Sequence, residues 1–391
     1  MVTARRAGTT GNGSSFVHAP REGRGKSGAP VGRNTIAAAF RWFRRSAASP
    51  PATLLRASGA IETAATSALR RRDLGLEWPP MTRIPVLIAA DVDRELLDRI
   101  GRDARFDVDY RPMRSEEELT GAVGDAEVLV TRHHNKVTTG VLDAAPRLRA
   151  IVQGTSGLDN IDPSAASRGV AIIGLPGENA NAVAELAIGL MISLTRTVPT
   201  YDRMVRGGSW QRDDCSSRRE LRGHCLGIVG IGRVGGRVAR LAGAFGMEAV
   251  AYDPYLDAGE IAMRGATKVD TLAVLIERSD ILTIHVPLTD ETRGMIGASE
   301  IARLPSGAFL INTARGEVLD RSAAIRALEE NRLGGIAIDV YGEEPPADAW
   351  PDDPRVILTP HIAGCTREAK ASIGRGVYAK ICDLYGFDPL G

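Results

Sequence analysis

Short apolar runs alternate with amphipathic stretches along the chain from residue 81 onward. In the first half, the apolar runs predict strands at 86–89, 106–110, 127–131, 150–152 and 170–173. Helical spacing of apolar residues predicts helices at 93–102, at 116–122 and over a longer stretch from Ala182 to about Arg196. Such alternation is typical of an α/β fold with a parallel sheet.

A second set of apolar runs begins at Leu226. It predicts six strands, at 227–229, 249–252, 281–285, 309–312, 336–340 and 357–359. Six parallel strands with short turns make a complete doubly wound, dinucleotide-binding sheet. The last predicted helix, 367–384, follows this sheet, and we expect it to return to the first sheet. The second domain is then an insertion in the first.

Residues 1–80 differ in composition from the rest, with 13 Lys and Arg against four Asp and Glu. Three interpretations fit: an Arg-rich targeting leader, a disordered extension, or a mis-assigned start with the true start at Met81. We favour the third, because a core strand begins directly after Met81.

Composition and charge limit the kinds of partner and the cellular compartment that we expect. A chain of 391 residues with a 43% apolar fraction suits two domains with sizeable cores. No apolar run reaches the roughly 18 residues that cross a bilayer, and the acidic balance after residue 80 gives no nucleic-acid footprint. Four cysteines without metal-ligand or disulfide spacing favour free thiols, so we expect no metal and a cytoplasmic location.

The run from Leu226 to Arg240 carries the clearest chemical signal. Gly230 permits a tight turn after a strand, Gly232 lets a pyrophosphate approach the backbone, and Gly235 lets the next helix pack closely. Asp253 ends the following strand, where a carboxylate accepts hydrogen bonds from ribose hydroxyls and repels a 2′-phosphate. The pattern predicts NAD rather than NADP. The plainer alternative is a glycine-rich turn without a ligand.

Three more candidates follow strands of the second sheet. Arg315 can bind a carboxylate through paired hydrogen bonds, although an arginine in a turn is also common on surfaces. His361 facing Glu344 would have one tautomer fixed and its protonated form stabilised, as proton transfer to an alkoxide requires. One such pair alone is more often structural. The placement of all three residues just after strands of one sheet favours a catalytic role instead.

Motifs across the chain from Met81 on resemble those of the D-isomer-specific 2-hydroxyacid dehydrogenases. Within that family they are most similar to the branch of D-3-phosphoglycerate dehydrogenases and hydroxypyruvate and glyoxylate reductases. The matching segments are residues 131–138, 157–162, 181–185, the glycine run, 285–293, 312–316, 339–345 and 359–364. The resemblance is highly specific for the family and weakly specific for the substrate.

This resemblance implies a flavodoxin-like substrate domain, 82–181 with 365–391, around an inserted NAD domain, 182–364. It implies oxidoreductase activity on a small D-2-hydroxy acid or 2-oxo acid pair, with His361 as acid/base, Glu344 as its partner and Arg315 as substrate anchor. The further residues expected at the cofactor are Arg233, Val234, Pro287, Thr313 and Asp339. Those expected at the substrate are Arg132 and the backbone amides of Gly154, Thr155 and Ser156. A homodimer through the helix after Ala182 and the segment 201–223 is also implied.

Two departures from the phosphoglycerate branch bear on which substrate the site would accept. The chain has Gln153-Gly-Thr-Ser-Gly157 where those enzymes have Arg-Ala-Gly-Val-Gly, and His133 where they have serine. These changes favour another small 2-oxo acid. An alternative function is an NAD-sensing co-repressor of the same fold, because such relatives keep the same three catalytic residues.

Overall fold

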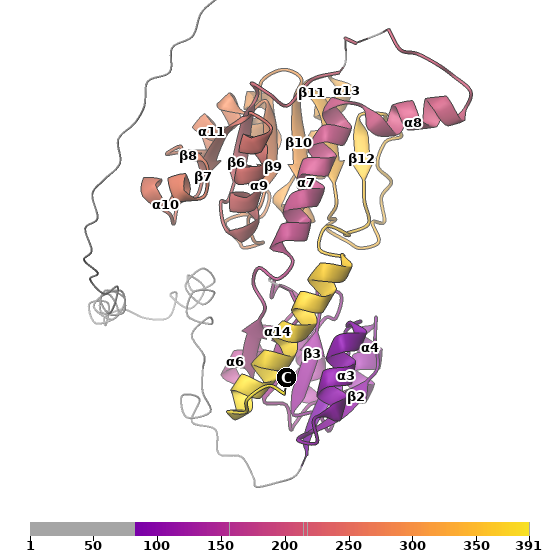
Figure 1. Cartoon of the computed structure of the whole chain (residues 1–391), viewed down its shortest axis with the longest axis vertical. Helices are drawn as coiled ribbons and strands as arrows, with labels where there is room; N and C mark the ends of the chain where they lie inside the picture. Colours follow the sequence, from indigo (N-terminus) through magenta and orange to yellow (C-terminus); the bar gives the residue numbers. More distant parts are fainter. Residues whose placement is uncertain (1–82, 156, 214, 217, 391) are drawn as a thin grey trace, which may run out of the picture. The chain divides into compact units, whose positions relative to one another are not determined.

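The computed structural model describes residues 83–390 apart from residues 156, 214 and 217. The expectations for residues 1–80 therefore lie outside the described part. The described chain forms two parallel β-sheets with helices (Figure 1). The α/β fold with two doubly wound sheets is confirmed, and the domain limits given above stay a prediction.

The first sheet has five strands in the order β2-β1-β3-β4-β5, all parallel. Its strands are β1 (Ile84–Ile88), β2 (Phe106–Tyr110), β3 (Val128–Thr131), β4 (Ala150–Gln153) and β5 (Ala171–Gly174). Its helices are α3 (Arg94–Arg102), α4 (Glu116–Ala122), α5 (Thr139–Asp143) and α6 (Ser164–Ser167). This is the flavodoxin-like strand order.

Helix α14 (Arg367–Tyr385) returns to this first sheet, as the sequence predicts, and packs against α3 and β4. The helix begins where the Thr366 side chain caps the amide of Ala369. Its apolar residues, among them Ile373, Val377 and Ile381, join the core formed by β1, β3 and β4. The chain segments on either side of the second sheet therefore share one core.

The second sheet has seven parallel strands in the order β12-β11-β10-β9-β6-β7-β8. They are β6 (Cys225–Val229), β7 (Glu248–Tyr252), β8 (Thr267–Lys268), β9 (Ile281–Ile284), β10 (Ala308–Asn312), β11 (Leu333–Ile338) and β12 (Val356–Leu358). The prediction of six strands is wrong by one. Strand β8 is two residues long and pairs only with β7, so it leaves no apolar run to detect.

Helices surround the second sheet. They are α7 (Ala180–Thr195), α8 (Val198–Arg206), α9 (Arg233–Ala244), α10 (Ala258–Met263), α11 (Leu272–Arg278), α12 (Ala298–Arg303), η1 (Gly316–Val318) and α13 (Arg321–Glu329). Helix α7 is mostly buried against α9 and β10. Among the described residues no single helix is long and apolar enough to span a membrane. Helices α7 and α8 pass that test only together, and they meet at a 63° bend.

Candidate active site

The second sheet reverses its strand order between β6 and β9, which is where ligands bind in such sheets. Gly230 directly follows β6 and has a φ of +82°. A side chain there would lie 2.6 Å from Val286 Cγ1 and 2.9 Å from the carbonyl oxygen of His285. The position therefore requires glycine both for its backbone conformation and for the approach of the loop after β9.

Gly232 and Gly235 show the two other properties predicted for the turn. An added Cβ on Gly232 would meet no atom within 4 Å, so a pyrophosphate has room beside the backbone at the start of α9. A Cβ on Gly235 would lie 2.3 Å from the carbonyl oxygen of Gly230. Helix α9 is therefore held in direct contact with the turn.

Asp253 directly follows β7 beside this turn. Its carboxylate accepts hydrogen bonds from the amides of Ile231 (3.2 Å) and Tyr255 (3.1 Å). A carboxylate has about four acceptor positions, so two remain for ribose hydroxyls. Asp253 thus ties the glycine turn to the end of β7 and presents a negative charge where a 2′-phosphate would lie.

The other residues expected at the cofactor lie after strands of the same sheet or at the start of α9. Thr313 follows β10, and its hydroxyl is buried without a hydrogen-bond partner among the described residues, which suits a ligand. Pro287 is exposed after β9, and Val234 is half-buried in the first turn of α9. Arg233 is exposed, and its guanidinium donates to the carbonyl oxygen of Pro176 in the first half of the chain. These features fit a dinucleotide.

Glu344 and His361 lie on loops that follow the neighbouring strands β11 and β12. Nδ1 of His361 is 2.8 Å from both carboxylate oxygens of Glu344. Because an ionised carboxylate only accepts hydrogen bonds, Nδ1 is the donor and Nε2 is left to exchange a proton with a substrate. His361 has a φ of +53°, an uncommon conformation for a residue with a side chain.

The pKa of Glu344 reflects two opposing effects. Burial raises it, but the hydrogen bond and charge of His361 and the amide of Tyr341 outweigh burial and lower the pKa below the usual glutamate value. Glu344 is therefore ionised throughout the neutral range and supplies the charge that stabilises a protonated imidazole.

We expect Glu344→Gln to move the pH dependence of 2-oxo acid reduction to lower pH. The amide keeps an acceptor but loses the charge opposite the imidazolium, so reduction should decline at a lower pH than in the unaltered protein. Oxidation uses neutral His361, so by the same argument it should be faster at low pH than in the unaltered protein. The measurement is kcat against pH in both directions, and an unmoved profile would exclude Glu344 as the charge partner.

His133, from the loop after β3, lies against the catalytic pair. Its ring stacks on that of His361 with centroids 4.4 Å apart and planes at 28°. Burial, followed by the charge of His361, lowers the pKa of His133 to about 3. His133 is therefore an uncharged neighbour of the acid/base. The sequence identifies it as a departure from the related branch but does not predict this stacking.

Possible ligand atoms of His133, Glu344 and His361 lie within 4.8 Å of one another. A Zn²⁺ ion needs nitrogen lone pairs that converge at about 2.0–2.1 Å. Two stacked rings with nearly parallel planes direct their lone pairs side by side instead. We interpret the group as a proton-transfer site.

Arg315 follows β10 and donates to Asp159, which lies after β4. Its Nε lies 3.1–3.2 Å from the two carboxylate oxygens and its Nη2 lies 3.0 Å from Oδ1, while Nη1 donates to the carbonyl oxygen of Ala314 at 2.7 Å. Burial raises the pKa of Asp159, but the hydrogen bonds and charge of Arg315 outweigh it and lower the pKa. The sequence predicts Arg315 but not Asp159, which is 156 positions away.

The backbone expected to hold the substrate carboxylate directly follows β4. The amide of Gly154 donates to the carbonyl oxygen of Thr131 at 2.7 Å, which continues the parallel pairing of β3 and β4 by one residue. The role of this amide at the substrate stays a prediction. Thr155 is buried, and its hydroxyl contacts Gln153 at 3.0 Å. Ser156 lies outside the described residues, and the amides of Thr155 and Ser156 stay a prediction.

Arg132 directly follows β3 and is half-buried. Its Nε is buried without a hydrogen-bond partner among the described residues. A buried donor of this kind suits an anionic group of a substrate. The expectation that Arg132 binds substrate stays a prediction with this support.

Asp339, expected near the nicotinamide, directly follows β11 and is fully buried. It accepts hydrogen bonds from the Thr359 hydroxyl (2.5 Å) and from the amides of Ile362 and Ala363 (2.9 Å each). The sequence does not predict these contacts. Asp339 therefore fixes the loop that carries His361, and its contact with a cofactor stays a prediction.

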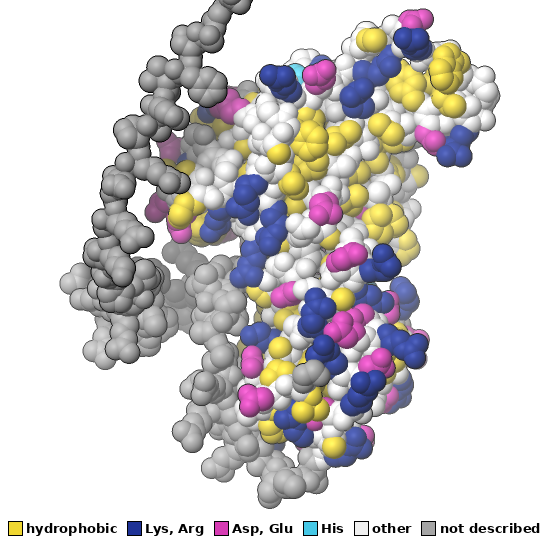
Figure 2. Space-filling model, in the orientation of Figure 1, with side chains coloured by type: hydrophobic (Ala, Val, Ile, Leu, Met, Phe, Trp, Pro, Cys, Tyr) yellow, Lys and Arg dark blue, Asp and Glu magenta, His cyan; other side chains and the backbone are white. Residues whose placement is uncertain are grey.

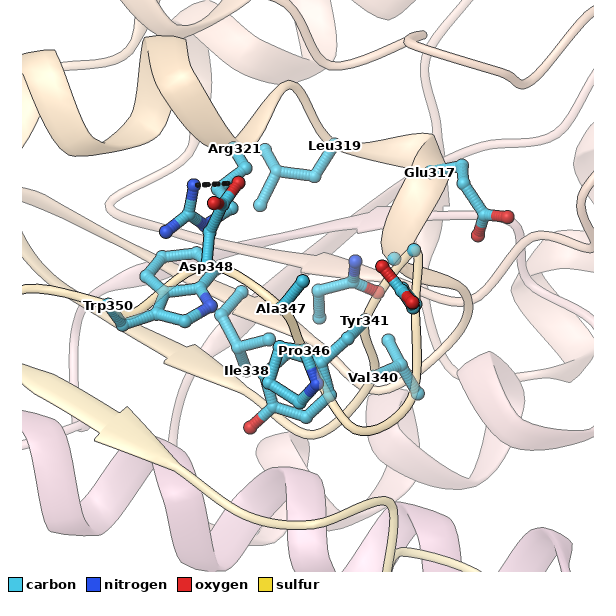
Figure 3. Close-up of a pocket in the computed structure, with 14 residues that line it drawn as sticks. Glu317, Leu319, Arg321, Ile338, Val340, Tyr341, Pro346, Ala347, Asp348 and Trp350 are labelled. Atoms are coloured by element: carbon cyan, nitrogen blue, oxygen red, sulfur yellow. Dashed lines mark ion pairs between the residues drawn. The ribbon is translucent and has the colours of Figure 1, made fainter.

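A cavity of about 250 Å³ is lined by residues of the loops that carry Arg315 and Glu344 and by residues that follow them. Gly316, Tyr341 and Glu343 form one wall, next in sequence to the catalytic residues or close to them. On the opposite wall Arg321 lies over the Trp350 ring and pairs with Asp348 (Figure 3). His361, Glu344 and Arg315 do not line this cavity, so it is separate from the catalytic pair.

The part of the chain that contains the glycine turn and the His361–Glu344 pair is similar to known proteins. The sequence model of the D-isomer specific 2-hydroxyacid dehydrogenase, NAD binding domain, matches residues 188–363. This part of the chain belongs to this family. The match covers all seven strands of the second sheet together with Arg315, Glu344 and His361.

Individual members of the family agree. A D-3-phosphoglycerate dehydrogenase of Archaeoglobus fulgidus is 37% identical over 305 residues, which are 76% of this chain and 57% of the relative. A glyoxylate reductase structure from Paecilomyes thermophila has a TM-score of 0.70 and 28% identity, and the match covers 78% of this chain and 97% of that one. A D-lactate dehydrogenase of Aquifex aeolicus, complexed with NAD and lactic acid, has a TM-score of 0.69 and 26% identity, over 76% and 94% of the two chains.

The chain spans just over half the length of the curated relatives that it matches, 54–58% in each of eight cases. The solved structures match over nearly their whole length. The shared part is therefore the pair of parallel-sheet domains described here.

Proposed function

We propose that this protein is an NAD-dependent oxidoreductase that interconverts a small D-2-hydroxy acid and its 2-oxo acid. Family membership supports the reaction class, and the crevice at Gly230, Gly232 and Thr313 supports the cofactor. The named relatives act as phosphoglycerate dehydrogenases or glyoxylate reductases. We propose a substrate similar in size and charge to the substrates of those enzymes.

The observation that carries the proposal is the His361–Glu344 pair at 2.8 Å on loops neighbouring that of Arg315. When bound, NADH supplies a hydride to the carbonyl carbon of the 2-oxo acid. Arg315 binds the carboxylate and orients the carbonyl group. His361 gives the proton on Nε2 to the carbonyl oxygen, and Glu344 stabilises the imidazolium before that transfer. The reverse reaction uses neutral His361 as the base.

The test is a screen of small 2-oxo acids with NADH and with NADPH, following absorbance at the nicotinamide band. Hydroxypyruvate, glyoxylate, pyruvate and 3-phosphohydroxypyruvate cover the substrates of the proposed branches. Turnover of at least one acid supports the proposal. Cofactor binding without turnover of any acid would contradict it.

We expect catalytic efficiency with NADH to exceed that with NADPH by about tenfold or more. The 2′-phosphate would lie beside the carboxylate of Asp253, and two negative charges side by side repel each other. Pro254 follows, so no arginine is present at the next position to neutralise the phosphate. Asp253→Ser should lower the NADH-to-NADPH ratio of kcat/KM. Equal efficiency with the two cofactors in the unaltered protein would refute the assignment.

We also propose that two copies of the chain associate through α7, α8 and the segment that follows. Val198, Val205 and Trp210 are exposed by 48%, 53% and 77%, and Figure 2 shows hydrophobic side chains over this helix. Val198 and Val205 lie on α8 and Trp210 lies in the segment just after it, and exposed apolar residues gathered in this way are typical of an interface. Light scattering of Val205→Glu and Trp210→Glu against the unaltered chain tests this, since a monomeric unaltered chain would contradict it.

The cytoplasm is the compartment we propose, because Cys215, Cys225, Cys365 and Cys382 are all free thiols in the structure. Cell fractionation with an antibody against the chain tests the location. Recovery in a secreted or membrane fraction would contradict it.

A further inference from the structure

The guanidinium of Arg315 has five N–H groups, and the structure shows where three of them donate. The side-on edge, made by Nε and Nη2, faces the carboxylate of Asp159 at 3.0–3.2 Å. One N–H of Nη1 donates to the carbonyl oxygen of Ala314 at 2.7 Å. When that bond uses the N–H on the Cδ side of Nη1, a planar guanidinium keeps one pair of parallel N–H groups, on the end-on edge between Nη1 and Nη2.

Gly157 explains how the two groups come so close. An added Cβ on Gly157 would lie 1.7 Å from Arg315 Nη2 and 2.6 Å from Asp159 Oδ1. The ion pair therefore lies directly against the bare backbone of the loop after β4. Asp159 and Arg315 belong to loops of different sheets, and their side chains are only 36% and 23% exposed.

We propose that Asp159 is a positioning residue that holds the side-on edge of Arg315, so that the end-on edge binds the carboxylate of the 2-oxo acid. The inference rests on the proposed function. It adds a residue to the site and specifies which two N–H groups of Arg315 contact the substrate. Asp159 itself does not touch the reacting atoms.

A competing possibility makes the opposite prediction. If Asp159 occupied the groups that the substrate needs, it would act as an intramolecular competitor, and removing its charge would tighten substrate binding. The two free N–H groups of the end-on edge argue against competition, because a carboxylate can bind there through two parallel hydrogen bonds while Asp159 remains in place.

The test begins with Asp159→Asn and steady-state kinetics for the best 2-oxo acid. An asparagine carries no charge and presents an NH₂ group to a donor, so Arg315 loses its fixed orientation. KM for the acid should rise about 10- to 100-fold, the usual size for a lost hydrogen bond to a charged group. The Kd for NADH, measured by fluorescence titration, should change less than about twofold.

The decisive measurement is a double-mutant cycle with Arg315→Lys. If Asp159 acts only through Arg315, the double variant should have nearly the same kcat/KM as Arg315→Lys alone. Asp159→Glu, which keeps the charge, should restore part of the loss in KM. Asp143→Asn is the matched control, because Asp143 also pairs with an arginine, Arg168 at 2.6 Å, but is 68% exposed. It should leave KM unchanged.

Three results would overturn the inference: an unchanged KM in Asp159→Asn, a lower KM, or effects of Asp159→Asn and Arg315→Lys that simply multiply. A matching rise in the Kd for NADH or a large fall in Tm would assign Asp159 a structural role instead. Failure of the proposed function is a separate outcome, since the unaltered protein would then reduce no 2-oxo acid in the initial screen.

Discussion

Replacing His361 by alanine should lower kcat about 10²- to 10⁴-fold at every pH, the usual contribution of general acid–base catalysis. Alanine can neither donate a proton to the carbonyl oxygen nor accept one from the hydroxy acid. It also leaves the carboxylate of Glu344 without its 2.8 Å partner. Because the loss is of the proton donor itself, no change of pH can restore the rate, in contrast to Glu344→Gln.

The control for this variant must preserve the backbone, since His361 has a φ of +53°. Asparagine tolerates that conformation better than most residues, and its amide can still donate to Glu344, but it cannot transfer a proton. His361→Asn should therefore lose turnover as His361→Ala does and keep the Tm and the Kd for NADH. Near-normal kcat in either variant would remove His361 from the mechanism.

Replacing Arg315 by lysine should reduce kcat/KM for the 2-oxo acid by about 10²- to 10³-fold, as removal of a preorganised charged donor does in other enzymes. An ammonium group carries the same charge but has no parallel pair of N–H groups. It can satisfy Asp159 or the substrate carboxylate, but it cannot hold both in the geometry of the guanidinium. Both KM and kcat should suffer, because the bound acid loses its orientation.

An exposed arginine provides the comparison for this substitution. Arg303, on α12, is 55% exposed and pairs with Glu277 at 3.2 Å. Surface pairs of this kind contribute little, so Arg303→Lys should leave all kinetic constants unchanged. If Arg315→Lys behaves like Arg303→Lys, the carboxylate binds elsewhere, and Arg132 with its unpartnered Nε becomes the first candidate.

The sequence predicts those parts of this fold that have a strong local signal. Strand β2 and helix α4 occur at the predicted residues, because an apolar alternation marks one and a Ser115–Glu118 capping box marks the other. Gly230 and Gly235 are also locally specified, Gly230 by its φ of +82° and Gly235 by its contact with the carbonyl oxygen of Gly230. Strand β8 has no such signal and depends on β7 for its existence.

Contacts between distant loops could not be predicted in the same way. The pairing of Asp159 with Arg315 and the stacking of His133 on His361 depend on how loops of two different sheets meet. No spacing within the chain encodes that distance.

The fixing of the His361 loop by Asp339 has a consequence for dynamics. The amide of His361 donates to Thr359, and those of Ile362 and Ala363 donate to a carboxylate that is fully buried. Three successive amides on a partly exposed loop are therefore closed to solvent. In native-state hydrogen exchange this loop should exchange as slowly as a core strand and open only in rare subglobal fluctuations. The acid/base group then rests on an element that does not reorganise on the timescale of turnover.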